Sequence, residues 1–297
     1  MHILLVFVVA YWIPGWLVLW LTKTSPAYQT LLAVPLGIAL WGWQAWIFGW
    51  LHLPWGAYGY LGLCIAAFIG VTMKHPNIIK EIWKSIASIG KDKPTLILLI
   101  IGVISQSMVL WNVLQPSGNT LVSCCGDPND NIWYASITKS ILESFPPHYP
   151  GITGQTLHNY HYWSNLVIAD LVRVFHVDQI LLQFRYSGVL LSLSLGLSLI
   201  ALSWRFTTKQ VFTRWLLFFF YFGGDMIYLI SIIQQRILSF PGSSLEDGIR
   251  FLSNPPRSYA VVIVLVLLTL YSLWREKLDI RKIALLAILL SATVGLK

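Results

Sequence analysis

Residues 24–73 read TSPAYQTLLAVPLGIALWGWQAWIFGWLHLPWGAYGYLGLCIAAFIGVTM and contain no Asp, Glu, Lys or Arg. A soluble domain carries charge on about 25% of its residues, so an uncharged stretch of this length excludes a water-soluble fold. A helix needs about 20 apolar residues to cross roughly 30 Å of hydrocarbon. The stretch therefore leaves room for two membrane crossings.

The rest of the chain has the same character. It has 297 residues, of which 56% are hydrophobic and 11% are charged, and its mean hydropathy is +0.68. No run alternates polar and apolar residues as the strands of a membrane barrel do, so helices are the expected spanning structure. We predict an all-α, polytopic transmembrane protein with about 8 spans, the last truncated at Lys297. The apolar blocks fall at about 2–21, 31–51, 57–73, 95–113, 180–204, 215–234, 258–274 and from Ile283 onward.

The Lys and Arg residues predict how these spans are oriented, because basic loops stay in the cytoplasm. Most of these basic residues fall in the connections between spans. All of these connections can lie on the cytoplasmic side only if residues 161–176 do not cross the membrane. Asp170 and Arg173 interrupt that stretch, and its polar residues gather on one helical face. We therefore expect an in-plane helix at the outer interface, with the N-terminus outside. The basic connections hold Lys23; Lys74, Lys80, Lys84, Lys91 and Lys93; Arg205, Lys209 and Arg214; and Arg275, Lys277, Arg281 and Lys282.

The start of the long outer loop carries two acids with competing interpretations. Asp127 precedes Pro128 and is well placed as a helix N-cap, and Asp130 then complements the helix dipole. Alternatively, Asp130 is a general base held at the boundary between water and membrane, where partial desolvation raises its basicity. A second acid is not needed for the cap, which favours a functional role for Asp130.

The order of motifs in this loop resembles the first outer loop of GT-C integral-membrane glycosyltransferases. Within that superfamily the loop is most similar to the bacterial branch related to protein O-mannosyltransferases and lipid A aminoarabinose transferases. The similarity is strongest over residues 126–163. It rests on Asp130-Asn-Ile-Trp133-Tyr-Ala135, a helix, Phe145-Pro146-Pro147, Pro150-Gly151 and Asn159-Tyr160-His161-Tyr162.

The resemblance implies an enzyme of the bacterial plasma membrane that acts on the outer face. Its donor would be a polyprenyl-phosphate sugar, and its acceptor a lipid, a glycan or a protein. Asp130 would be the catalytic base, with Asp127 as a second acid, and the two could hold a divalent metal ion. No other cofactor is implied.

The resemblance also suggests three regions. Residues 1–73 would be an N-terminal three-span addition, and residues 74–94 a cytoplasmic amphipathic linker. Residues 95–297 would be a GT-C-like transmembrane core, incomplete at the C-terminus, with an outer loop at 115–179. The net charge of +8 follows from membrane topology, so we expect membrane lipids and no nucleic acid as partners.

Four further residues are candidates for substrate binding. Asp225 follows two glycines inside an apolar block, where an acid is costly and suggests a function, although a loop-entry acid is the alternative. Arg257 could pair with a lipid-linked phosphate or anchor a helix end. His158 and His161 could hydrogen-bond to sugar or phosphate, or cap local backbone groups.

Two other function classes compete with the enzyme. A multi-span transporter would show inverted repeats and charges or broken helices in several spans, whereas here the charges gather in one outer loop. A non-catalytic membrane scaffold would be indifferent to substitution of Asp130. The sequence has no Walker loop, dinucleotide fingerprint or HExxH motif, which argues against a nucleotide-driven pump and a zinc protease.

Overall fold

The computed structural model describes residues 2–111, 115–117, 120–122, 128–152, 154–158, 160–222 and 255–295. This part of the chain is mostly helical, and its two short strands, β1 (Gln115–Ser117) and β2 (Thr120–Val122), pair antiparallel. The predicted all-helical class is confirmed.

Within these residues, five segments are long and apolar enough to cross a membrane, as expected for a multi-pass membrane protein. They are Ile3–Leu21, α3 (Pro26–Trp50), α4 (Gly56–Lys74), Gln179–Phe206 and Pro256–Trp274 of α14 (Pro255–Trp274). The first consists of α1 (His2–Phe7), the π-helical turn η1 (Val8–Trp12) and α2 (Ile13–Leu21). The fourth consists of α9 (Gln179–Leu181), the π-helical turn η2 (Leu182–Tyr186) and α10 (Ser187–Phe206).

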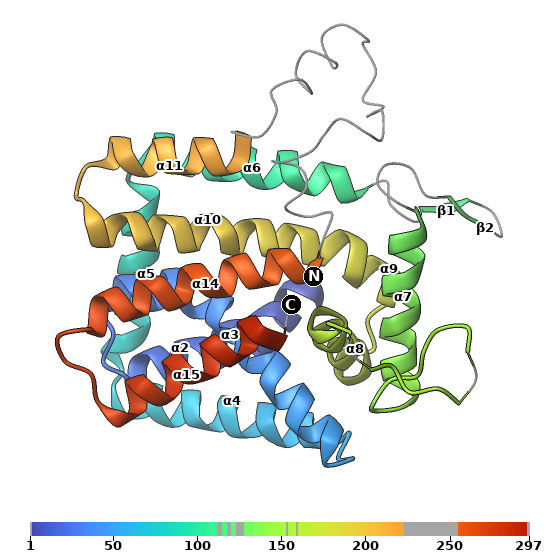
Figure 1. Ribbon diagram of the computed structural model, residues 1–297. Helices are drawn as coiled ribbons and strands as arrows, with labels where there is room; N and C mark the ends of the chain where they lie inside the picture. Colours follow the sequence, from blue (N-terminus) through green and yellow to red (C-terminus); the bar gives the residue numbers. More distant parts are fainter. Residues whose placement is uncertain are drawn as a thin grey trace, which may run out of the picture.

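Three further helices lie in the other predicted apolar blocks. They are α6 (Lys93–Trp111), α11 (Gln210–Phe222) and α15 (Ile280–Gly295). Most of the helices run alongside one another in alternating directions (Figure 1). Two helices cross this bundle at opposite ends, α5 (Asn77–Gly90) at one end and α7 (Pro128–Glu143) at the other, and α8 (Trp163–Phe175) lies beside α7 and is seen nearly end-on.

One hydrophobic core extends from Val6 in α1 to Ala292 in α15. Helix α3 is central to it and packs against α2, α8, α10 and α14. A Cβ atom added at Gly37 would lie 1.8 Å from the backbone oxygen of Tyr11, so glycine is what lets α3 approach η1 this closely. The three helices before residue 74 therefore share their core with the rest of the chain.

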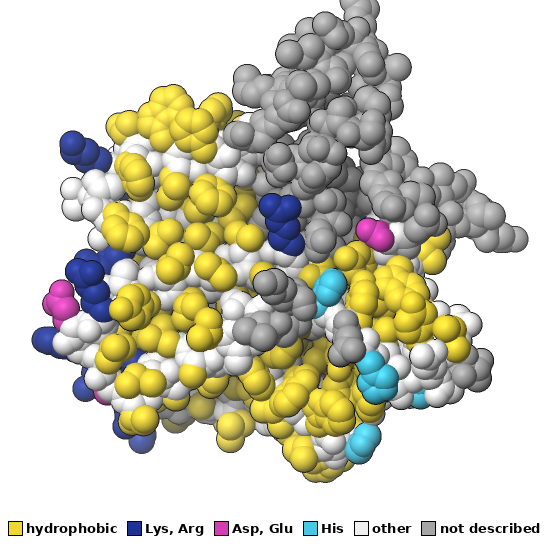
Figure 2. Space-filling view, viewed as in Figure 1, with side chains coloured by type: hydrophobic (Ala, Val, Ile, Leu, Met, Phe, Trp, Pro, Cys, Tyr) yellow, Lys and Arg dark blue, Asp and Glu magenta, His cyan; other side chains and the backbone are white. Residues whose placement is uncertain are grey.

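The basic connections gather at one end of the bundle. Arg214, at the start of α11, forms an ion pair of 2.8 Å with Asp92, just before α6. The Nε atom of Arg205, at the end of α10, donates to the backbone oxygen of Ser272 near the end of α14. Figure 2 shows Lys and Arg at this end and histidines toward the other, with hydrophobic side chains over the helices between them.

Helix α8 lies where the sequence predicted it, but the protein buries it. Asn165 and Asp170, expected on a face turned toward water and headgroups, are only 2% and 3% exposed. They contact α7 and α3, because each makes a hydrogen bond to one of these helices. The polar face of α8 is thus a packing surface within the protein.

Candidate functional site

Helices α7 and α8 form the framework of the end opposite the basic connections. The Nδ2 atom of the buried Asn165 donates to the backbone oxygen of Tyr134 at 2.7 Å and to Oγ1 of Thr138 at 3.0 Å. Gln179, just after α8, donates to the backbone oxygen of Ala135 at 2.8 Å. Three hydrogen bonds therefore fix the middle of α7 to the chain that follows the loop.

The loop between the two helices is tied back onto α7. Oγ of Ser140 donates to the backbone oxygen of His148 at 3.0 Å and accepts from its backbone nitrogen at 2.8 Å. The loop then turns through Gly151 and Gly154, whose φ angles of +83° and +79° lie in the left-handed region that glycine tolerates best. The backbone nitrogen of Tyr149 donates across this turn to Gln155 at 2.7 Å.

Asp130 lies in the first turn of α7 and is exposed. The helix begins at Pro128, as the N-terminal proline predicted. Burial raises the pKa of the Tyr134 hydroxyl, and the neighbouring Tyr160 and the carboxylate of Asp130 raise it further. Burial also raises the pKa of Tyr160, and Asp130 contributes to that rise. The acid therefore lies within electrostatic reach of both tyrosines.

Aromatic side chains of α7 and of the loop pack together at this end. The Tyr160 ring stacks on His161 with ring centroids 4.6 Å apart and an angle of 13° between the planes. Trp133 meets the rings of Tyr149 and Tyr160 edge-on, with centroid distances of 5.1 and 6.0 Å. Such rings offer apolar faces next to polar groups. The arrangement can present an acid beside a surface on which a sugar ring could stack.

The predicted site residues are only partly brought together. Asp130 and His161 are linked through Tyr160, while His158 is exposed in the preceding loop and Arg257 is exposed in the first turn of α14. Asp127 and Asp225 lie outside the described residues. Within the described residues there is no group of three His, Cys, Asp or Glu side chains that could hold a metal ion.

A second polar location lies at the far end of α7. A cavity of about 290 Å³, open to the surface, lies between the end of α3, the end of α7 and α8. Along α7, Asp130 and Glu143 at the cavity are thirteen positions apart, or about 20 Å at the rise of an α-helix. Its ionisable lining residues are His52, Glu143, Asp170 and Arg173.

Asp170 is the buried acid of this cavity. Its carboxylate accepts a hydrogen bond from Nε2 of Gln44 on α3 and lies 3.4 Å from the Arg173 guanidinium. Arg173 also donates to the backbone oxygen of Ile141 at 3.0 Å, which ties it to α7. Burial raises the pKa of Asp170 to about 6, against the opposing effects of Gln44 and Arg173. This carboxyl group therefore titrates close to neutral pH.

The sequence did contain a signal for this cavity. Asp170 and Arg173 interrupt an otherwise apolar helix, a pattern that fits an interfacial polar face as well as a buried one. Gln44 is one of few polar side chains in the middle of the uncharged stretch at 24–73. Buried polar side chains are usually hydrogen-bonded to a polar partner. This rule favours a contact between Gln44 and the polar face that carries Asp170.

Comparison with known proteins found no match to this chain among family models, curated proteins or solved structures.

Proposed function

We propose that this protein is a membrane glycosyltransferase that transfers a sugar from a polyprenyl-phosphate donor to an acceptor on the outer face of the membrane. The observation that carries the proposal is the position of Asp130. It is an exposed acid in the first turn of a helix that crosses the end of the bundle, next to the aromatic group formed by Trp133, Tyr149, Tyr160 and His161.

The proposed topology supports this location. Adding α6, α11 and α15 to the five long segments gives eight spans, and the basic connections then lie in the cytoplasm. The loop that contains Asp130, together with α7 and α8, then faces the opposite side. That is the side to which a lipid-linked sugar is presented after it has crossed the membrane.

In this proposal Asp130 acts as a general base. The oxygen of the acceptor hydroxyl attacks C1 of the sugar, and its proton passes to the Asp130 carboxylate. The bond between C1 and the phosphate oxygen breaks, and its electron pair leaves with the polyprenyl phosphate. A direct displacement inverts the configuration at C1. Substrates bound over the exposed acid would exclude water and raise its basicity.

Other residues would position the two substrates. His161 stacks on Tyr160, whose pKa Asp130 helps to raise, and His161 would hydrogen-bond to the sugar. A cation is needed near the leaving phosphate, and Arg257 in the first turn of α14 is a candidate because a guanidinium binds phosphate in a bidentate manner. Asp127 and Asp225 remain proposed substrate ligands, and Asp127 together with Asp130 would supply carboxylates for a divalent metal ion.

The cavity at Asp170 offers a second candidate for the acid. Its carboxyl group has a pKa of about 6, which suits acid–base catalysis near neutral pH better than an ordinary aspartate. Asp170 pairs with Arg173, which contacts Ile141. Ile141 is eleven positions from Asp130 along α7, or about 16 Å, so one substrate hydroxyl cannot reach both acids. Parallel substitution of the two residues therefore identifies which one acts.

The test is transfer of labelled sugar from polyprenyl-phosphate donors by the full chain in membranes. Asp130→Asn should lower the rate by roughly 100-fold or more, as expected when a general base is lost. Asp178→Asn is a matched control, because Asp178 is also exposed at this end and caps α9, a role that asparagine fills equally well. Equal transfer by wild type and Asp130→Asn would contradict the proposed base.

The same assay distinguishes the other function classes. A transporter would move labelled donor or ion across vesicles without forming a glycosidic bond. A scaffold would show neither transfer nor transport, and Asp130→Asn would leave its properties unchanged.

A further inference from the structure

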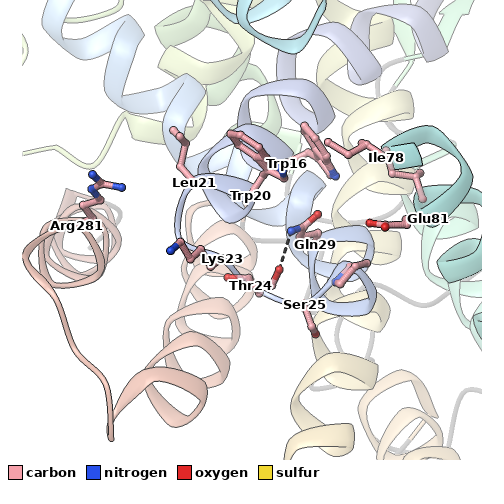
Figure 3. A pocket seen from close by; sticks show the side chains of 12 residues that line it. Trp16, Trp20, Leu21, Lys23, Thr24, Ser25, Gln29, Ile78, Glu81 and Arg281 are labelled. Atoms are coloured by element: carbon pink, nitrogen blue, oxygen red, sulfur yellow. Dashed lines mark hydrogen bonds between the residues drawn. The ribbon is translucent and has the colours of Figure 1, made fainter. Parts of the chain in front are cut away.

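A cavity of about 530 Å³ lies at the basic end of the bundle, away from Asp130 (Figure 3). Its walls come from the end of α2, the turn into α3, one face of α5 and the first turn of α15. The volume is in the range of small-molecule sites. The proposed glycosyl transfer makes no use of it.

The cavity is lined by a buried hydrogen-bond donor. The Trp16 side chain is 1% exposed, and its indole Nε1 is buried with no hydrogen-bond partner in the described part of the chain. Figure 3 shows the Trp16 and Trp20 indoles side by side at the cavity wall above Gln29. A buried N–H group without an acceptor costs about 1–3 kcal/mol. An acceptor atom supplied by a ligand would remove that cost.

The charges around the cavity are separated. Figure 3 shows Lys23 and Arg281 toward one side and Glu81 on the opposite side. Within the described residues none of the three takes part in an ion pair. The backbone of Lys23 has a φ angle of +56°, in a region that residues other than glycine rarely adopt. The cavity therefore has a cationic side and an anionic side.

The start of α3 also contributes positive potential to the cavity. Ser25 and Pro26 line the cavity, and α3 extends from there for 25 residues. The Ser25 side chain makes no capping hydrogen bond, so it leaves the first-turn amides of α3 to other partners. The positive end of a helix dipole and free amide groups favour a bound anion.

We propose that this cavity binds a phospholipid headgroup that carries both a phosphate and a primary ammonium, as phosphoethanolamine does. The phosphate lies on the cationic side, where Lys23 and Arg281 donate to its oxygens, and Trp16 Nε1, which Figure 3 places between Lys23 and Glu81, donates to the phosphate oxygen that faces it. The ammonium lies on the other side and donates to Glu81. The acyl chains leave along Leu21, which is 53% exposed at the cavity edge.

This charge arrangement predicts selectivity among headgroups. A choline headgroup carries a methylated ammonium that cannot donate a hydrogen bond to Glu81. A glycerol headgroup has hydroxyl donors but no positive charge to pair with the carboxylate. The ethanolamine lipid should therefore bind most tightly, by roughly tenfold over the choline lipid, the amount expected for one hydrogen bond to a charged group.

The test is native mass spectrometry of the purified full chain in detergent, titrated with phosphatidylethanolamine, phosphatidylcholine, phosphatidylglycerol and soluble glycerophosphoethanolamine. Lys23→Ala/Arg281→Ala should weaken binding of all three lipids by roughly tenfold or more. Trp16→Phe should weaken it to a lesser extent. Glu81→Gln should remove the preference for ethanolamine over choline while retaining binding.

The matched control is Lys84→Ala/Arg275→Ala, which removes two exposed cations from the same end of the bundle but outside the cavity. An equal loss of binding in both double variants would contradict a binding site in this cavity, because the loss would then come from the lower surface charge alone. Equal binding of all three lipids by wild type would overturn the headgroup assignment. If soluble glycerophosphoethanolamine bound as tightly as the lipid, the ligand would be a soluble phosphoester and the lipid would be excluded.

Discussion

The side-chain amide of Gln44 donates a hydrogen bond of 2.5 Å to the carboxylate of Asp170. The two residues are 126 positions apart, one within α3 and the other in α8. This contact is buried and joins the central helix of the bundle to the helix that closes its end. Because one partner is ionisable, the strength with which α8 is held depends on pH.

The first prediction concerns that pH dependence. The pKa of Asp170 is about 6 in the folded protein against a usual value of 3.8, so the folded state retains the proton to higher pH than the unfolded state. Stability from this group is therefore present below about pH 4 and decreases as the pH rises to 6. The loss is at most about 3 kcal/mol. Thermal unfolding in detergent between pH 4 and 7.5 measures it.

Asp170→Asn is the comparison for this measurement, because asparagine does not titrate. The difference in stability between variant and wild type should grow in favour of the variant as the pH rises from 4 to 6. A difference that does not change over this range would show that Asp170 titrates normally.

The second prediction separates the hydrogen bond from burial. Gln44→Leu removes the donor that stabilises the charged carboxylate, so the pKa of Asp170 should rise above 6. The stability of this variant should continue to decrease with pH beyond the point where that of wild type levels off. Gln106→Leu is the control, since Gln106 is a buried glutamine of α6 that instead accepts from Ser192 at 2.7 Å. It should lower stability without moving the titration.

The third prediction addresses how α7 is held. Asn165→Ala removes two buried hydrogen bonds to α7 and should cost about 2 kcal/mol of stability. Backbone amides in the middle of α7 should also exchange hydrogen faster, because the helix keeps only the Arg173–Ile141 hydrogen bond to α8. Asn77→Ala, at the exposed start of α5, should change neither quantity. Unchanged exchange in Asn165→Ala would mean that the Asn165 hydrogen bonds do not hold α7 and that its other contacts are sufficient.

The fourth prediction tests the close approach of η1 and α3. Gly37→Ala places a methyl group within 2.6 Å of three Tyr11 backbone atoms, so the helices must separate, at a cost of about 1–3 kcal/mol. Gly62→Ala is the matched control on α4, where nothing lies within 4 Å of the added carbon. The midpoint of thermal unfolding should fall for the first variant and stay constant or rise for the second.

Composition and charge predicted the helical class, the apolar blocks and the common end of the basic loops, because membrane insertion acts on these properties directly. Pro128 likewise predicted where α7 begins. The burial of α8 could not be predicted in the same way. Its polar residues Asn165 and Asp170 fit a water-facing surface equally well until their partners are known, and those partners, Tyr134, Thr138 and Gln44, come from distant parts of the chain. The periodicity of a helix shows that one of its faces is polar, but it does not show whether water or protein covers that face.

The indole of Trp43 on α3 donates to the backbone oxygen of Ile288 on α15, 245 residues later in the chain. A ribosome adds about 5–20 residues per second, so roughly 12–50 s pass between the synthesis of these two partners. During that interval the central helix has been inserted while one of its permanent neighbours does not yet exist. The surface of α3 that α15 will cover must be occupied by lipid, by an insertion factor or by another part of the chain. The packing of α3 against α15 therefore forms only after α15 has been made and has displaced that temporary occupant.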